Sequence, residues 1–186
     1  MKRLKSNKVA LSNVVSTLII LVVSVLLAGV VSMYAVNITS TRTQQEALKL
    51  SKQEIWVYGN GTAYAALAID NVGGRDVIID KIQVRGVEAS WSNVYYIRRS
   101  SAISSSLNCP DATPTWTNFT YTSGQTATFT NDTNDKPLAS GDTMILYIRN
   151  PESISVSDIG VTIGITVFTE NAQYYVECNV KSAESA

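Results

Sequence analysis

An uncharged stretch near the N-terminus constrains the fold of this chain more than any other feature. No charged residue lies between Lys8 and Arg42, and residues 14–36 are almost wholly apolar. A helix over residues 14–36 would be about 34 Å long, because an α-helix rises about 1.5 Å per residue. The hydrocarbon core of a bilayer is about 30 Å thick. The sequence therefore predicts a membrane-spanning helix.

The charges on the two sides of this stretch predict its orientation. Only Arg42 follows it closely, whereas four basic residues precede it: Lys2, Arg3, Lys5 and Lys8. Basic residues next to a spanning helix remain on the cytoplasmic side. We therefore expect a cytoplasmic N-terminus, with the chain from about Thr39 onward outside the cell.

Three kinds of segment have this general pattern. A cleaved secretory signal has a shorter apolar region followed by an A-x-A-like site, and no such site follows Tyr34. A plain signal anchor fits both the length and the charges. The third kind is suggested by residues 8–20, KVALSNVVSTLII, which follow a short basic leader and open a long aliphatic helix.

This start resembles that of archaeal type IV pilins. The resemblance implies that residues 1–10 are a class III leader, removed on the cytoplasmic side by a prepilin peptidase. The cut would fall between Val9 and Ala10 or between Ala10 and Leu11, so the helix stays in the mature protein. The resemblance also implies assembly partners: further copies of the chain, a pilus assembly ATPase and a membrane platform protein, with membrane lipid around the helix before assembly.

The helix is predicted to run past the membrane, over residues 11–53. Residues 44–52 are rich in good helix formers, and Glu46 and Lys49 are spaced to support a helix. Such a helix would be about 60 Å long. Small residues recur at four-residue intervals, which lets apolar helices approach closely; these predicted packing positions are Ser24, Ala28 and Ser32.

Residues 54–186 read as an extracellular β-rich domain. Apolar residues alternate over 159–167 and again over 174–180, which predicts a C-terminal hairpin. A second hairpin is predicted between residues 64–70 and 77–84, and it is similar to one that recurs in archaeal pilins and archaellins. Further strands are expected at residues 55–58, 91–97 and 144–148. The predicted class is α+β, a long helix followed by a small antiparallel β-sandwich or barrel of immunoglobulin-like type.

Residues 100–140 are polar and rich in Ser, Thr and Asn, so we expect an exposed insertion here. The chain has N-x-[ST] sequons at Asn37, Asn60, Asn118 and Asn131. Asn37 lies too near the membrane to be a good acceptor. Asn60, Asn118 and Asn131 are therefore the predicted glycosylation sites.

The two cysteines, Cys109 and Cys178, both fall in the predicted extracellular domain, where a disulfide can persist. Cys178 shares its strand face with Val176 and Val180, so its thiol is expected to point inward. We predict a bridge between the two cysteines. The alternative is two buried free thiols that behave as small apolar groups.

Several classes of function are disfavoured by the composition. The chain has no histidine, and no phosphate-binding or nucleophile-elbow motif; we expect no enzyme activity and no cofactor. Asp70, Asp76 and Asp80 flank one turn and could bind calcium, although solvated carboxylates are the simpler interpretation, and no metal site is predicted. Without its basic leader the chain is mildly acidic, which argues against nucleic acid as a partner.

Aromatic residues offer one further possibility. Trp56, Trp91 and Trp116, with several tyrosines, could form a stacking surface for sugars. Core packing and contacts between subunits are the expected use for most of them.

Two functions remain after these exclusions. The first is a structural subunit of an extracellular pilus-like filament, used for adhesion or surface attachment. The precursor would lie in the membrane, and the mature protein in a filament at the cell surface. The alternative is a singly anchored extracellular binding module or minor pilin-like protein, for solute or sugar capture or as an envelope stalk.

Overall fold

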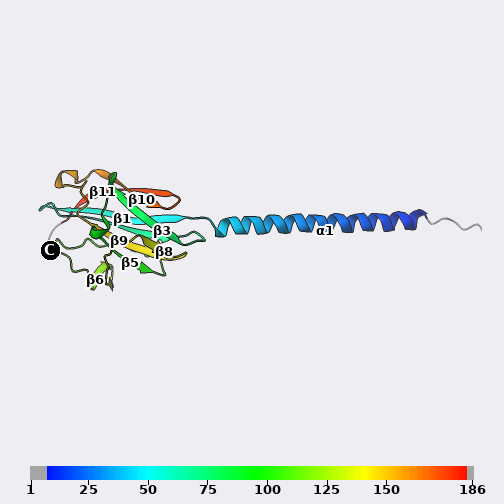
Figure 1. The fold of residues 1–186 in the computed structure, drawn as a ribbon, viewed down its shortest axis with the longest axis horizontal. Coiled ribbons are helices and arrows are strands. Elements are labelled where there is room, and N and C mark those ends of the chain that lie inside the picture. Colours follow the sequence, from blue (N-terminus) through cyan, green and yellow to red (C-terminus); the bar gives the residue numbers. More distant parts are fainter. Residues whose placement is uncertain (1–7, 184–186) are drawn as a thin grey trace, which may run out of the picture. The chain divides into compact units, whose positions relative to one another are not determined.

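The computed structural model describes residues 8–183 of the 186-residue chain, apart from the side chains of residues 8–11, 42 and 43. The chain divides into two units after Thr43. The first is helical and the second is built of strands (Figure 1). This arrangement confirms the predicted α+β class, with one long apolar helix followed by a curled, sandwich-like sheet domain.

The helical unit is one uninterrupted helix, α1 (Lys8–Thr43). The predicted continuation to residue 53 is wrong, because strand β1 (Leu48–Tyr58) begins only a few residues later. Leu48 and Leu50 lie two residues apart, which suits a strand with one buried face, and residues 48–51 pair with residues 68–71. Helix propensity is a weak preference, and this pairing overrides it.

The second unit contains a nine-stranded sheet among the described residues. Eight strands follow the order β4-β3-β10-β11-β1-β2-β9-β5, and β8 pairs with β3. A separate small hairpin joins β6 to β7. The remaining elements are β2 (Ala63–Asn71), β3 (Val77–Val84), β4 (Val87–Glu88), β5 (Val94–Arg99), β6 (Phe119–Thr122), β7 (Gln125–Ala127), β8 (Lys136–Leu138), β9 (Thr143–Arg149), β10 (Thr162–Thr169), β11 (Gln173–Ala183), η1 (Trp91–Asn93) and η2 (Val156–Asp158).

The sheet curls around a single inner core. Ile82 on β3, Ile165 on β10, Leu67 on β2 and Leu146 on β9 belong to one buried cluster. In the sheet order, β11 and β1 separate the pair β3 and β10 from the pair β2 and β9. Their alternate residues point inward, as the period of two requires. The predicted C-terminal hairpin is confirmed, because β10 and β11 pair in antiparallel register from Thr162 to Phe168.

The predicted hairpin between residues 64–70 and 77–84 is wrong. Both segments are strands, but β2 lies between β1 and β9, whereas β3 pairs with β10, β4 and β8. The intervening loop 71–76 carries the chain from one half of the sheet to the other. The side-chain amide of Asn71 shapes this crossing by donating to the carbonyl oxygens of Arg75 (2.9 Å) and Leu138 (3.1 Å).

The polar region 100–140 is not simply an exposed insertion. It supplies Leu107, Tyr121 and Phe129 to a second buried cluster, which we call the outer aromatic cluster. The sheet contributes Trp56, Tyr58, Tyr64, Ala66, Ala68, Ile145 and Tyr147 from the outward face of β1, β2 and β9. The region therefore covers one outer face of the sheet with a core of its own.

A buried lysine, Lys136, lies near the C-terminal end of this region. Lys136 has no exposed surface, and its ammonium lies 4.7 Å and 4.9 Å from the ring centres of Trp91 and Tyr96. It donates to the carboxylate of Asp132 and to backbone oxygens of Asp132 and Asn134. The hydroxyl of Tyr96 donates to the other carboxylate oxygen, at 2.6 Å. Hydrogen bonds from Lys136 and Tyr96 lower the pKa of Asp132 to about 2.

Candidate functional site

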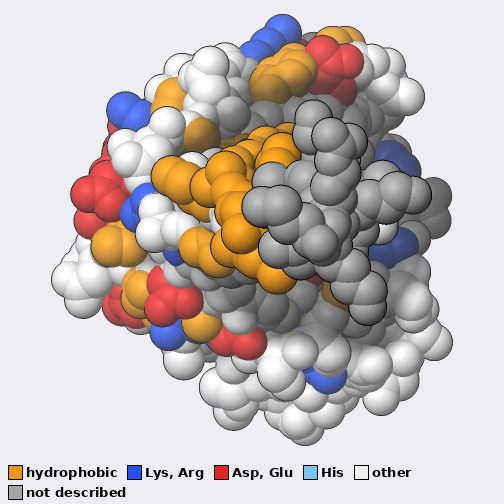
Figure 2. All heavy atoms as spheres, turned by 90° about the vertical axis from the view of Figure 1, so that its right-hand side faces the viewer, with side chains coloured by type: hydrophobic (Ala, Val, Ile, Leu, Met, Phe, Trp, Pro, Cys, Tyr) orange, Lys and Arg blue, Asp and Glu red, His pale blue; other side chains and the backbone are white. Residues whose placement is uncertain are grey.

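Helix α1 presents an apolar surface of unusual extent. Residues Ser12–Thr41 form a segment of 30 residues that is long and apolar enough to cross a membrane. No part of its most apolar 18-residue stretch is buried. Val30 and Met33 are 70% and 72% exposed. Figure 2 looks onto the N-terminal end of α1, where hydrophobic side chains gather. A helix that is apolar all round requires lipid or other helices around it, so α1 is compatible with a membrane anchor or a signal sequence.

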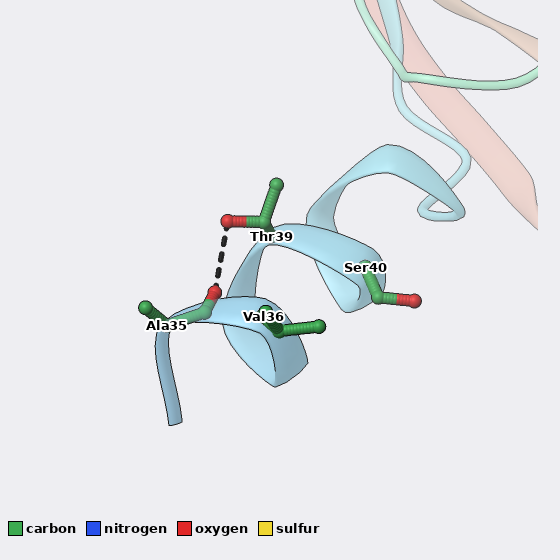
Figure 3. A pocket seen from close by; sticks show the side chains of 4 residues that line it. All are labelled: Ala35, Val36, Thr39 and Ser40. Atoms are coloured by element: carbon green, nitrogen blue, oxygen red, sulfur yellow. Dashed lines mark hydrogen bonds between the residues drawn. The ribbon is translucent and has the colours of Figure 1, made fainter. Parts of the chain in front are cut away.

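Four hydroxyl groups of α1 donate to backbone carbonyls of the same helix. Thr17, Ser24 and Thr41 donate to the carbonyl oxygens of Val14, Ile20 and Asn37 at 2.7–2.9 Å. Thr39 donates to the carbonyl oxygen of Ala35 at 2.9 Å, beside a shallow hollow lined by Ala35, Val36, Thr39 and Ser40 (Figure 3). A hydroxyl bonded in this way can enter an apolar environment at low cost.

The predicted packing positions all lie in the exposed middle of α1. Ser24, Ala28 and Ser32 recur every four residues, so they share one face of the helix. The hydroxyl of Ser24 is bonded to the carbonyl oxygen of Ile20, which leaves a compact surface. Next to this face, a Cβ added to Gly29 would meet no atom within 4 Å. Close approach of another helix through these residues stays a prediction.

The predicted leader cleavage site lies in the first turn of α1. Val9, Ala10 and Leu11 have helical backbone, and their side chains are outside the described part. The first N–H groups of a helix have no partner within it, so this turn opens more readily than those that follow. Cleavage before Ala10 or Leu11 stays a prediction.

The structure distinguishes the predicted glycosylation sites. Asn60 lies in the exposed turn between β1 and β2, and its side-chain oxygen accepts from the amide of Thr62 at 2.9 Å. Asn118 is exposed, with a positive φ of 61°. Asn131 differs, because its side-chain nitrogen donates to the carbonyl oxygens of Ser92 (2.7 Å) and Val94 (3.2 Å). A glycan would attach to that nitrogen and displace these bonds.

The predicted disulfide is wrong, since Cys109 and Cys178 are both free thiols. Cys178 points toward the inner core, as predicted, but Cys109 packs against the outer aromatic cluster. The two thiols thus belong to clusters on different sides of the sheet. Burial raises the pKa of both, that of Cys178 to about 11, so both are protonated near neutral pH.

The three aspartates around loop 71–76 do not form a metal site. Asp70 is buried and accepts from Thr143, Asp76 accepts from the amide of Ser140, and Asp80 lies exposed on β3. No group of three potential metal ligands occurs among residues 8–183 as described.

The tryptophans mainly pack. Trp56 is buried in the outer aromatic cluster. Trp116 stacks on Tyr95, with ring centres 4.2 Å apart, and lies beside Phe129 of the same cluster, with ring centres 5.8 Å apart. These contacts confirm core packing as their main use.

One feature that sequence reasoning missed is the segment Gln45–Ala47, which we call the joint. The amides of Val72 and Gly73 both donate to the carbonyl oxygen of Ala47, at 2.9 and 3.0 Å, and Gly74 donates to that of Gln45, at 3.2 Å. A Cβ at Gly73 would lie 2.6 Å from the Ala47 nitrogen and 2.7 Å from the Gln45 oxygen. The paired glycines are a signal for close backbone approach, but the same pair also suits the hairpin turn that the sequence predicts.

Comparisons with known protein families and with curated proteins found no family model and no curated sequence that matches this chain. Its function is therefore inferred from its own residues.

Proposed function

We propose that this protein is the structural subunit of an extracellular filament of the archaeal type IV pilus kind, used for adhesion or surface attachment. The observation that supports this most is α1, which is uncharged over residues 12–41 and exposes apolar side chains on its whole surface. At about 1.5 Å per residue these residues span about 45 Å, against about 30 Å for the hydrocarbon of a bilayer. The excess suits a helix that also packs against copies of itself.

The energetics of α1 provide a reason to assemble. In the membrane its aliphatic surface is solvated by acyl chains, whereas in an aqueous filament neighbouring helices must cover it. Covering apolar surface gains about 25 cal/mol per Å² relative to water. Assembly through α1 therefore keeps the helix out of water after it leaves the lipid, while the sheet domain forms the outer layer.

Removal of the leader would act as the switch for assembly. An uncut leader places Lys2, Arg3, Lys5 and Lys8 at the helix end, and charges are costly to bury without partners. A prepilin peptidase that cuts before Ala10 or Leu11 removes all four. The assembly ATPase and platform protein would then move the helix from lipid into the filament.

The alternative is a singly anchored extracellular binding module or minor pilin-like protein. The position of the end of α1 favours this alternative, because α1 ends at Thr43, ten residues before the predicted end at residue 53. A single membrane crossing needs no more than this helix offers.

Electron microscopy of sheared cell-surface material, with mass spectrometry of its N-terminal peptide, tests the proposal. We expect filaments that contain this chain, with Ala10 or Leu11 as its N-terminal residue. A chain that stays in the membrane fraction with residues 1–8 attached would support the anchored module instead.

A further inference from the structure

We propose that the joint and strand β1 form a mechanical clamp, which resists tension that enters the sheet domain from α1. The inference rests on the proposed function for the source of the tension. A subunit fixed in a filament by α1 and attached elsewhere through its domain is pulled at Gln44. The contacts that receive this tension lie wholly within the strand unit.

The first part of the clamp is the joint. Three backbone amides of loop 71–76 hold Gln45 and Ala47. On its other side, the carboxylate of Glu46 accepts from the hydroxyl of Thr169, at the end of β10, and from the side-chain amide of Asn171 (3.3 Å), in the β10–β11 turn. Two separate loops therefore grip the chain before β1 begins, and Gly73 allows one of them to approach closely.

The second part is the position of β1 in the sheet. β1 has neighbours on both edges, antiparallel β2 and parallel β11. The parallel register joins Ile55–Tyr58 of β1 to Val180–Ala183 of β11. An ion pair of 2.5 Å between Glu54 and Lys181 adds a contact at the same place. In the middle of the sheet, β1 is thus paired with β2 from Leu48 to Val57, with one irregularity, and with β11 over its last four residues.

The direction of pull decides how these bonds break. In a parallel pair, the N-terminal end of β1 and the C-terminal end of β11 lie at opposite ends. Pulling between them shears the strands, so all the hydrogen bonds of the pair are strained together. Pulling between two points at the same end opens the bonds one after another, which requires less force.

Single-molecule force measurements on the full chain in detergent micelles test the clamp. One handle is a click-reactive residue at Gln44. The second is placed either at Ser182 of β11, which pairs with Val57 at the C-terminal end of β1, or at Glu170, in the β10–β11 turn beside the joint. All three positions are exposed. We expect the rupture force between Gln44 and Ser182 to exceed that between Gln44 and Glu170 several-fold. Equal forces would overturn the proposal.

A pair of glycine variants tests the joint. Gly73→Ala should add a separate low-force extension before the main rupture in the Gln44 and Ser182 geometry, because the joint is already loosened. Gly59→Ala should not, since a Cβ at Gly59 meets no atom within 4 Å. An unchanged trace for Gly73→Ala would remove the joint from the clamp. These force measurements need no filament. Equal rupture forces would therefore overturn the clamp without touching the filament proposal, and a failure to find filaments by electron microscopy would not change the measured forces.

Discussion

Replacement of Gly73 by alanine should destabilise the sheet domain without altering α1. The new methyl group would lie 2.6 Å and 2.7 Å from backbone atoms of Ala47 and Gln45. Backbone atoms cannot rotate away as a side chain can, so the joint must separate from loop 71–76. The hydrogen bonds at risk are those from Val72, Gly73 and Gly74, at 2.9, 3.0 and 3.2 Å.

The size of the effect follows from these bonds. Each contributes about 1 kcal/mol net, so the loss of two or three costs about 2–3 kcal/mol. Alanine also restricts the unfolded chain, which returns about 0.4–1 kcal/mol. The net loss of about 1–2.6 kcal/mol lowers the Tm by roughly 3–10 °C for a domain of this size.

Thermal unfolding of the full chain in detergent, followed by the circular dichroism of the strands, measures this loss. Gly59→Ala is the matched control: it lies in an exposed turn, its new methyl group would have no neighbour within 4 Å, and it should leave the Tm unchanged or slightly higher. Faster hydrogen exchange at Val72 and Gly74 should accompany the lower Tm. If Gly73→Ala and Gly59→Ala unfold at the same temperature, the joint contributes nothing to stability.

Three other results are expected. The pKa of Asp132 is lower in the folded protein, so the ionised carboxylate contributes its full stabilisation above about pH 4 and loses it as the pH falls through about 2. The Tm difference between Asp132→Asn and the unaltered protein should therefore be constant near neutral pH and shrink toward about pH 2. A Tm difference that does not change with pH would contradict this. Mass spectrometry of protein from the native host should find glycans at Asn60 and Asn118 and none at Asn131. Thr120→Ala, which removes the Asn118 sequon, should therefore lower the glycan mass, and Thr133→Ala should not; a glycan on Asn131 would show that its bonds to Ser92 and Val94 are dispensable. Both Cys109 and Cys178 should react with an alkylating reagent in unfolded, unreduced protein, giving two modified thiols per chain, whereas a chain that resists modification until it is reduced would carry the bridge.

The long apolar helix and the strand content were predictable from sequence because each depends on a local pattern. The uncharged run specifies α1, and alternation of apolar residues specifies β10 and β11. The end of α1 was not predictable in this way. Residues 44–52 favour a helix on their own, but pairing of Leu48 and Leu50 with β2 makes them a strand, with an irregularity at Lys52, where φ is 56°.

Strand partners were harder to predict, because they depend on contacts between distant residues. Loop 71–76 has the residues of a hairpin turn, yet it connects two halves of the sheet, and β2 and β3 do not pair. The polar region 100–140 was hard to interpret for a related reason. Its few aromatic residues are spread among Ser and Thr, and only the fold brings them over β1, β2 and β9.

Among the predicted site residues, too, features set by a local pattern were predictable and features set by contacts between distant residues were not. The inward direction of Cys178 followed from strand alternation and is confirmed. Its pairing with Cys109 required knowledge of which side of the sheet residue 109 occupies, and that depends on the folded polar region. The side-chain amide of Asn131 donates hydrogen bonds to η1 and β5, and a three-residue sequon could not predict these bonds.

Assembly through α1 is tested most directly by a charge placed on the helix face that carries Ser24, Ala28 and Ser32. An arginine at the centre of a membrane helix costs about 2.5–3.5 kcal/mol on the insertion scale, whereas each Leu, Ile or Val contributes about −0.3 to −0.6. With its many aliphatic residues, α1 of Ala28→Arg should still enter the membrane. In a filament, however, every subunit would bring one unpaired charge among the packed helices. Thr41→Arg is the matched control, because it adds the same charge at the end of the apolar segment, beside Arg42.

The decisive measurement is negative-stain electron microscopy of filaments sheared from cells that express each variant, with membrane fractionation and circular dichroism to verify insertion and folding. Assembly through α1 predicts filaments from Thr41→Arg and none from Ala28→Arg, with both proteins folded and membrane-bound before assembly. Filaments of unchanged form and number from Ala28→Arg would contradict it and leave α1 as an anchor only.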